Sequence, residues 1–354
     1  MNNSPLLSLD DYEKACQELL PEAIWIYLSG GAGRETTISA NLEAFRKWKL
    51  CGTPLESQTT EPEISVSMFG HEIGIPILLA PTSPQRLFHP EAELASITGA
   101  HNAGSVCIVS TDSHYSLREM GNYGSFWFQL YCYGERSTTA TCLRVAEDAG
   151  ATAIVVTVDN NFEARRISLQ RCGFACPDDV EFGVLREIGY SDGSVPDNAR
   201  LPRRMVNWNE LEFIRSITSL PVLVKGIMRA SDAHRLIDAG VSGLIVSNHG
   251  GRQLDDSLAS LDAMTMIASE VNGAIPILMD GGIRSGLDVI KAIALGADAV
   301  CIGRPYVWGM TIAGAAGVQS VINLMREELL DGMCQLGLSS LSAIDRDFAF
   351  LASR

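Results

Sequence analysis

The sequence has few basic residues for its length, and this scarcity limits what the protein can bind. Its 354 residues include 27 Lys and Arg against 42 Asp and Glu, which gives a formal net charge of −15 at pH 7. A general nucleic-acid binder is not expected, because phosphate backbones are bound by basic surfaces. An anionic ligand would have to be held by a few locally placed arginines.

The sequence also lacks a long apolar run and a secretory start. No apolar run reaches the roughly 18 residues needed to span a bilayer. The N-terminus, MNNSPLLSLDDYEKACQELL, has no basic start followed by an apolar core. The nine cysteines are an odd number, scattered through apolar segments such as SVCIVS and DAVCIG. They are typical of reduced core residues, so we expect a cytoplasmic protein without a signal peptide or a membrane partner.

Two familiar motifs are incomplete or missing. Cys172 and Cys176 are spaced CxxxC, but no second Cys/His pair follows at zinc spacing, so two free thiols are favoured over a metal site. No glycine fingerprint of a dinucleotide-binding fold follows the first apolar run, IPILLA at 75–80. This absence disfavours a doubly wound sheet.

What the sequence does contain is a rhythm of short apolar runs, each followed by a helix-like segment. The runs are continuous rather than alternating, which is typical of parallel strands covered on both faces. Eight strand–helix repeats close most naturally into a (β/α)8 TIM barrel, an α/β fold, with a doubly wound sheet as the structural alternative. The predicted strands are 75–80, 105–110, 126–131, 153–159, 221–226, 243–248, 276–282 and 299–305.

We predict a single domain over 1–354, and the 46% hydrophobic composition is ample for one large core. An N-terminal cap with at least one helix covers 1–75, the barrel covers 76–310, and C-terminal helices cover 311–354. A long polar loop, 172–207, follows the fourth strand. Loops of this length in a barrel are usually lids or disordered.

Polar side chains follow nearly every predicted strand, at the ends where barrels of this type carry their chemistry. The turns DGGIRSG and IGRP after the last two strands combine exposed backbone N–H groups with arginines, which predicts a phosphate site. The residues at the strand ends are Thr82, Ser83, Ser110, Gln129, Tyr131, Thr157, Asp159, Lys225, His249, Arg252, Asp280, Gly282, Arg284, Gly303 and Arg304.

Three of these residues indicate the kind of chemistry. Lys225, at the end of PVLV, must either pair with an anion or lose its proton. An anionic reduced flavin would provide the anion, and a Schiff-base lysine is the alternative. His249 can act as a base near neutral pH, with Asp159 orienting it. Arg252 offers the bidentate contact that a carboxylate substrate needs.

The motif LIVSNHGGRQLD, at 244–255, resembles the active-site signature of the FMN-dependent 2-hydroxy acid oxidases and dehydrogenases. This family includes glycolate oxidases, lactate oxidases and mandelate dehydrogenases. Further similar segments run through nearly the whole chain in the family's order, namely LPEAIWIYLSGGAG, APTSPQRLFHPEAE, FQLY, TVD, LVKG, DGGIRSG and IGRP. Within the family, QRLFHPE looks most like the 4-hydroxymandelate oxidase branch.

The resemblance implies a role for each site residue. His249 would be the catalytic base paired with Asp159, and Lys225 would stabilise reduced FMN. Arg166 and Arg252 would clamp the substrate carboxylate. The remaining roles are substrate hydrogen bonding by Tyr27 and Tyr131, isoalloxazine binding by Thr82, Ser83, Ser110, Gln129 and Thr157, and phosphate binding by Asp280, Gly282, Arg284, Gly303 and Arg304. The implied reaction oxidises an (S)-2-hydroxy acid to a 2-oxo acid in a homo-oligomer, a tetramer by resemblance, with oxygen or another acceptor reoxidising the flavin.

Three departures from the family pattern concern the substrate pocket. Asp112 stands where many members place tryptophan or another apolar residue, Ser83 replaces a small apolar residue, and DNNFEARR replaces the common DTP turn. Asp112 predicts a substrate with a hydroxyl, amine or amide away from its carboxylate. The alternative is that Asp112 caps the helix near SLREM. Two other functions stay open, a flavin-dependent isomerase without net redox change and a non-catalytic flavin or ligand-binding protein.

Overall fold

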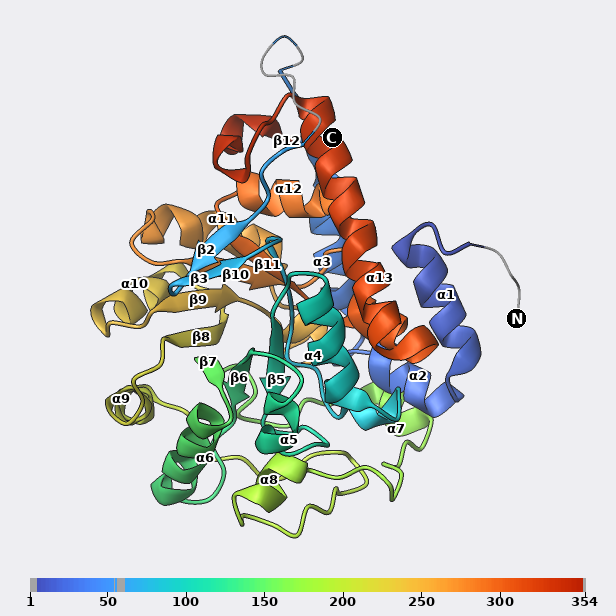
Figure 1. The fold of residues 1–354 in the computed structure, drawn as a ribbon, viewed down its shortest axis with the longest axis vertical. Helices are drawn as coiled ribbons and strands as arrows, with labels where there is room; N and C mark the ends of the chain where they lie inside the picture. Colours follow the sequence, from blue (N-terminus) through green and yellow to red (C-terminus); the bar gives the residue numbers. More distant parts are fainter. Residues whose placement is uncertain (1–4, 54, 56–60, 353–354) are drawn as a thin grey trace.

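Eight parallel strands form a closed barrel at the centre of the molecule, which confirms the (β/α)8 fold (Figure 1). The computed structural model describes residues 5–53, 55 and 61–352. The strands pair in the order β10-β11-β4-β5-β6-β7-β8-β9, and β9 pairs with β10 to close the sheet. They are β4 Ile77–Leu79, β5 Cys107–Ser110, β6 Phe126–Leu130, β7 Ala151–Thr157, β8 Val222–Ile227, β9 Gly243–Val246, β10 Ile277–Asp280 and β11 Ala299–Ile302.

Helices follow the strands and cover the outside of the barrel. The helices between strands are α4 Ala92–Asn102, α5 Leu117–Gly121, α6 Arg136–Asp148, α9 Trp208–Ser216, α10 Ala230–Asp238, α11 Ser260–Val271 and α12 Gly286–Ala294. Two short helices, α7 Ile167–Arg171 and α8 Gly183–Glu187, lie in the long connection after β7. The outer faces of the strands and the inner faces of the helices share one large apolar core.

The N-terminal segment folds into three helices and a short strand. These are α1 Leu9–Leu19, α2 Glu22–Ser29, α3 Thr36–Lys47 and β1 Trp48–Leu50. β1 pairs antiparallel with β12, Ala349–Leu351, so the end of the N-terminal segment lies beside the last strand of the chain. Pro21, which cannot continue a preceding helix, separates α1 from α2.

The interior of the barrel is filled, so ligands can enter only from one end. Side chains from all eight strands, among them Trp127 and Leu223, pack into a separate apolar cluster inside the barrel. The antiparallel pair of β2, Val66–Met68, and β3, His71–Ile73, contributes to that cluster. The ring centres of Phe69 and Trp127 are 5.5 Å apart. The amino end of the barrel is therefore plugged, and the polar groups are at the carboxyl end.

The long C-terminal helix α13, Arg304–Leu336, packs along the outside of the barrel (Figure 1). By length and composition it could cross a membrane, but half of its most apolar stretch is buried inside the fold. It contacts α4, α1 and α12, and its helical geometry is interrupted at Ala313 and Gly314. We therefore interpret α13 as a core helix of the barrel. The boundary at residue 310 falls inside it.

Candidate active site

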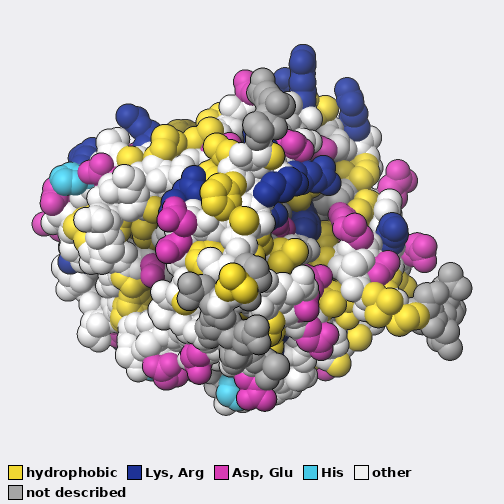
Figure 2. Space-filling model, turned by 90° about the horizontal axis from the view of Figure 1, so that it is seen from above, with side chains coloured by type: hydrophobic (Ala, Val, Ile, Leu, Met, Phe, Trp, Pro, Cys, Tyr) yellow, Lys and Arg dark blue, Asp and Glu magenta, His cyan; other side chains and the backbone are white. Residues whose placement is uncertain are grey.

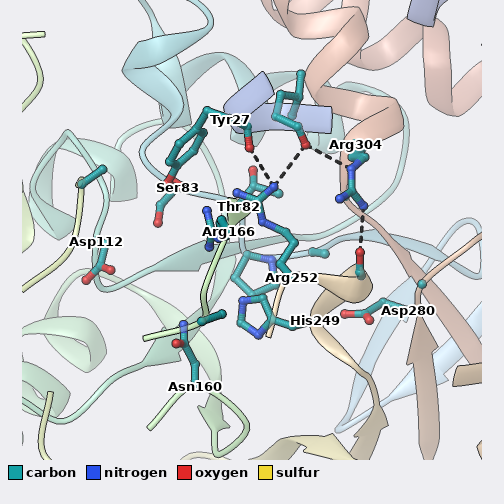
Figure 3. A pocket seen from close by; sticks show the side chains of 18 of the residues that line it. Tyr27, Thr82, Ser83, Asp112, Asn160, Arg166, His249, Arg252, Asp280 and Arg304 are labelled. Carbon is teal, nitrogen blue, oxygen red and sulfur yellow. Dashed lines mark hydrogen bonds between the residues drawn. The ribbon is translucent and has the colours of Figure 1, made fainter. Parts of the chain in front are cut away.

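The carboxyl ends of the strands open into one cavity of about 320 Å³ (Figure 3). Residues from α2, from the long connection after β7 and from most of the strand ends line it. It brings together Tyr27, Thr82, Ser83, Tyr131, Arg166, Lys225, His249, Arg252, Asp280, Gly282, Arg284, Gly303 and Arg304. The other predicted residues, Ser110, Gln129, Thr157 and Asp159, lie at or just beyond the ends of β5, β6 and β7.

His249 and Asp159 form a polar pair at this end of the barrel, with Nδ1 of the histidine 3.0 Å from Oδ1 of the aspartate. His249 has a φ of 59°, in the left-handed region that a side chain adopts only when its surroundings hold it there. Burial lowers the pKa of His249 below its usual value, although Asp159 opposes this effect. The imidazole is therefore neutral at pH 7, and its Nε2 can accept a proton.

Lys225 is buried and lies in a network with two residues at the ends of the next two strands of the barrel, β9 and β10. Its Nζ donates to Ser247 Oγ at 2.7 Å and lies 3.1 Å from Asp280 Oδ2, while Ser247 Oγ donates to Asp280 Oδ1 at 2.6 Å. Burial lowers the pKa of Lys225, but attraction to Asp280 and Asp159 outweighs it and raises the pKa. The ammonium is therefore charged, which argues against a Schiff-base lysine, since that chemistry needs a neutral amine.

Four arginines, Arg166, Arg252, Arg284 and Arg304, line the cavity without a salt bridge to any described residue. Arg252 and Arg304 donate to backbone carbonyls, including those of Leu28 and Gly30, as Figure 3 shows in part. Along residues 5–53, 55 and 61–352, none of the four forms a salt bridge.

The electrostatics of this arginine cluster suit an anionic ligand. Burial, Arg166 and Arg304 depress the pKa of Arg252 well below its usual value. Burial, Arg284 and Arg166 lower the pKa of Arg304 to about 10. Buried cations that repel one another are stabilised by bound anions. Acidic side chains are scattered over the face of the molecule in Figure 2, whereas these arginines gather positive charge inside the cavity.

Two polar atoms at the ends of β6 and β7 are buried without a hydrogen-bond partner in the described part of the chain. They are Gln129 Nε2 and Thr157 Oγ1. The other amide atom of Gln129, Oε1, accepts from Ser110 Oγ at 2.9 Å, which fixes the orientation of the amide. Buried polar groups are almost always paired in proteins, so these two atoms indicate a polar ligand lying against the strand ends.

Around Tyr131, the structure adds two residues that the sequence did not single out. Asn160 Nδ2 donates to the Tyr131 hydroxyl at 2.9 Å. The guanidinium of Arg203 lies 3.5 Å from the centre of the Tyr131 ring. Asn160 stands in the unusual DNNFEARR turn, which was a usable signal. Arg203 is far from any strand end in the sequence, and no pattern placed it here.

Asp112 is buried and lines the cavity, but it is not free to receive a substrate group in the way the sequence suggested. Its Oδ1 accepts from the Tyr133 hydroxyl at 2.6 Å, and its Oδ2 forms a salt bridge with Arg203. The alternative interpretation as a helix cap is wrong. Ser116 caps α5, and its hydroxyl accepts from the backbone N–H of Glu119.

The segment 172–207 is folded against the cavity. It contains α8, and Phe182 and Leu185 pack in an apolar cluster with Tyr131 and Tyr133. Two arginines from the same segment line the cavity. The segment therefore forms part of the cavity wall. The two cysteines of this segment, Cys172 and Cys176, are free thiols, as are the other seven cysteines of the chain.

Comparison with known proteins agrees with this geometry. The model of the FMN-dependent dehydrogenase family matches residues 16–350, so the chain belongs to that family. It is 40% identical to a 4-hydroxymandelate oxidase from Amycolatopsis orientalis, over 96% of this chain and 97% of that protein. It is 38% identical to an L-lactate oxidase from Nostoc, over 99% of both chains.

Solved structures of mandelate oxidase have the same fold. One superposes with a TM-score of 0.91 at 39% identity, covering 97% of this chain and 98% of that one. A variant of mandelate oxidase, with 2-hydroxy-phenylacetamide, also gives 0.91, at 38% identity and with 99% of this chain covered. The family predicted from LIVSNHGGRQLD is therefore confirmed.

The residues present fit FMN, the cofactor of this family. Gln129 Nε2 and Thr157 Oγ1 offer hydrogen bonds to the polar edge of an isoalloxazine ring, and Lys225 offers a buried cation beside it. Arg284 and Arg304, at the ends of β10 and β11, provide positive charge for one terminal phosphate.

Proposed function

We propose that this protein oxidises the (S)-enantiomer of a 2-hydroxy acid to the corresponding 2-oxo acid, with FMN as cofactor. The single observation that carries the proposal is that one cavity holds both a neutral, partly buried base and partly buried arginines that form no salt bridge with any described residue. The base is His249, and the arginines that would bind the same substrate are Arg166 and Arg252. A base beside an anion site suits a substrate whose acidic group lies next to the reacting carbon.

The substrate carboxylate would bind Arg166 and Arg252. The guanidinium groups of both lie near the ring of Tyr27, at 5.6 and 5.2 Å from its centre. Carbonyls of Tyr27, Leu28 and Gly30 hold Nη1 of Arg252. A guanidinium held in place by the backbone loses little freedom when it binds a carboxylate, and it positions the 2-carbon beside His249.

His249 would take one proton from the substrate, from its hydroxyl or its 2-carbon. Asp159 then faces an imidazolium cation at 3.0 Å and stabilises it. The Tyr131 hydroxyl, held by Asn160, would hydrogen-bond the substrate. FMN, when bound, accepts the two electrons that leave the substrate, and Lys225 supplies a fixed positive charge near the ring.

FMN would be held by two groups of residues. The ring would contact the row at the ends of β4 to β8, namely Thr82, Ser83, Ser110, Gln129, Thr157 and Lys225. The phosphate would lie at the ends of β10 and β11, near Gly282, Arg284, Gly303 and Arg304. Asp280, which the sequence also assigned to the phosphate, binds Lys225 and Ser247 through its carboxylate.

The alternative of a flavin isomerase without net redox change is not supported, since the comparisons give named oxidases. Those names support oxygen as the acceptor that we propose, with one hydrogen peroxide formed per turnover. Nine free cysteines support a cytoplasmic location. A homo-oligomer is part of the proposal, and light scattering on the purified protein tests it.

The proposed function is tested by anaerobic mixing of the FMN-loaded protein with a panel of 2-hydroxy acids in both enantiomers. We expect (S)-enantiomers to bleach the oxidised flavin and to yield the 2-oxo acid. Reduction by neither enantiomer of any member of a broad panel, with FMN fully bound, would show that the proposed function is wrong.

A further inference from the structure

The side of the cavity around Tyr131 carries an arginine that the mechanism does not use. Arg203, from the segment 172–207, has only 7% of its side chain exposed and lines the cavity. Its guanidinium lies 3.5 Å from the centre of the Tyr131 ring. It is therefore next to the residue that would contact the substrate.

Asp112 and Tyr133 fix the orientation of this guanidinium. Arg203 Nη2 forms a salt bridge with Asp112 Oδ2, and Arg203 Nε donates to the Tyr133 hydroxyl at 3.1 Å. That hydroxyl in turn donates to Asp112 Oδ1 at 2.6 Å. The third nitrogen, Arg203 Nη1, is buried and has no partner among the described residues. A fixed donor without an acceptor, in a cavity wall, points to an acceptor on the ligand.

We propose that Arg203 determines substrate specificity, by donating a hydrogen bond from Nη1 to a neutral hydroxyl or carbonyl oxygen at the end of the substrate away from its carboxylate. This inference rests on the proposed function and deepens it. The sequence predicted that Asp112 would accept a hydrogen bond from the substrate. In this proposal the hydrogen bond runs the other way, because Arg203 donates it to the substrate.

The charges on this wall favour a neutral acceptor over a second carboxylate. Arg203 is already neutralised by Asp112, so another anion on the same guanidinium would lie close to that carboxylate. Arg200 donates to the carbonyls of Phe162 and Asn160, and the acidic Glu163 lies on the same wall. Asn160 Oδ1 is a second buried atom on this wall that has no partner within residues 5–53, 55 and 61–352, and a hydroxyl of the substrate would donate to it.

The test compares substrates that differ only in the distal acceptor. The pairs are mandelate with 4-hydroxymandelate, and 2-hydroxypentanoate with 2-hydroxy-4-oxopentanoate, while 2-hydroxypentanedioate provides an anionic acceptor. For the wild-type protein we expect kcat/KM for the neutral acceptor to exceed that for its plain partner in at least one pair by about 10- to 100-fold, the range for one hydrogen bond to a charged group.

Removing Arg203 alone would leave Asp112 buried and unpaired, so the informative variant is Asp112→Leu combined with Arg203→Met. We expect this double variant to lower the ratio to about one or below, because two apolar side chains replace the ion pair. Arg204→Gln is the control, because Arg204 points to Gly134 and Thr139 and does not line the cavity. It should keep the wild-type ratio.

Binding is measured separately, by calorimetric titration of the FMN-loaded protein with benzoylformate and 4-hydroxybenzoylformate, because binding does not require turnover. A wild-type ratio near one in both kinetic pairs, or a ratio that survives in the double variant, would overturn the inference alone. A preference for 2-hydroxypentanedioate would overturn the neutral acceptor. Binding that favours the 4-hydroxy compound through Arg203, without flavin reduction by any 2-hydroxy acid, would refute the proposed function and leave the acceptor site standing.

Discussion

The 3.0 Å contact between His249 Nδ1 and Asp159 Oδ1 joins the ends of β9 and β7 across β8, the strand that carries Lys225. Asp159 and Lys225 shift each other's pKa through their charges, and both shift the pKa of His249. Burial raises the pKa of Asp159, but the hydrogen-bonded His249 and the Lys225 cation outweigh it, so the pKa of this carboxyl is lowered. Asp159 is therefore ionised at neutral pH, and its charge favours a proton on the imidazole.

Replacing Asp159 by Asn should change the pH dependence of flavin reduction in a defined direction. Attraction to Asp159 raises the pKa of His249 against the larger effect of burial, so its loss lowers that pKa further. Since the neutral imidazole is the active form, the acid limb of the rate profile should move to lower pH. The plateau should fall by about 10²-fold, because the imidazolium loses its counter-ion.

The measurement is stopped-flow reduction across a pH series, with Asp148→Asn, at the exposed end of α6, as control. An acid limb that moves to higher pH in Asp159→Asn would contradict the assignment.

His249→Ala should retain FMN and lose flavin reduction. The imidazole is the neutral base in the cavity, and general-base loss typically removes about 10²–10⁴-fold in rate. Rapid-mixing absorbance measures the rate, and His234→Ala serves as the matched control, because that side chain is 59% exposed on α10. Near-wild-type reduction in His249→Ala, with bound FMN verified, would remove the histidine from the reaction.

Arg252→Lys should weaken substrate binding and slow reduction together. A lysine ammonium cannot reproduce the planar donor set, nor the contacts of Nη1 with the carbonyls of Tyr27, Leu28 and Gly30. We expect kcat/KM to fall by about 10²-fold or more, since the carboxylate contact also orients the reacting carbon. The control is Arg46→Lys, with an arginine side chain that is 75% exposed. If the rate of flavin reduction depends on substrate concentration in Arg252→Lys as it does in wild type, Arg252 does not bind the substrate carboxylate.

Arg304→Leu should separate the stability of the apoprotein from its affinity for FMN. Removing a partly buried cation that Arg284 and Arg166 repel should leave the apoprotein as stable as wild type or more so. The Kd for FMN should rise by about 10- to 100-fold, since one charge-assisted hydrogen bond is lost.

Denaturant unfolding with and without FMN checks both parts. In wild type, FMN at 100 times its Kd adds about 2.7 kcal/mol to the free energy of unfolding. An unchanged Kd in Arg304→Leu would place the phosphate elsewhere, and Arg144→Leu, an exposed substitution, should alter neither quantity.

The barrel and most of the site could be predicted because each depends on local sequence. Continuous apolar runs mark strands that are buried on both faces, and a polar residue directly after such a run lies at the carboxyl end of the barrel. His249, Lys225 and Arg304 were found in this way. Arg203 could not be found, because it reaches the cavity through a long connection whose path no periodicity specifies.

Asp112 shows the same limit. Its position after β5 correctly placed it beside the cavity, but its partners, Tyr133 and Arg203, come from two other segments. A sequence pattern identifies the residue at a strand end. Tertiary packing determines which donors contact its carboxylate. Because Tyr133 and Arg203 occupy the carboxylate of Asp112, the pocket offers the substrate a donor instead of an acceptor.

The most direct measurement of the central claim is an anaerobic single turnover with limiting (S)-2-hydroxy acid, followed by quantification of reduced flavin and 2-oxo acid together. The proposed function requires one 2-oxo acid for each FMN reduced, with no reduction by the (R)-enantiomer and none on the same timescale in His249→Ala. Substrate turnover that leaves the flavin oxidised, or flavin reduction without an equal amount of 2-oxo acid, would contradict it.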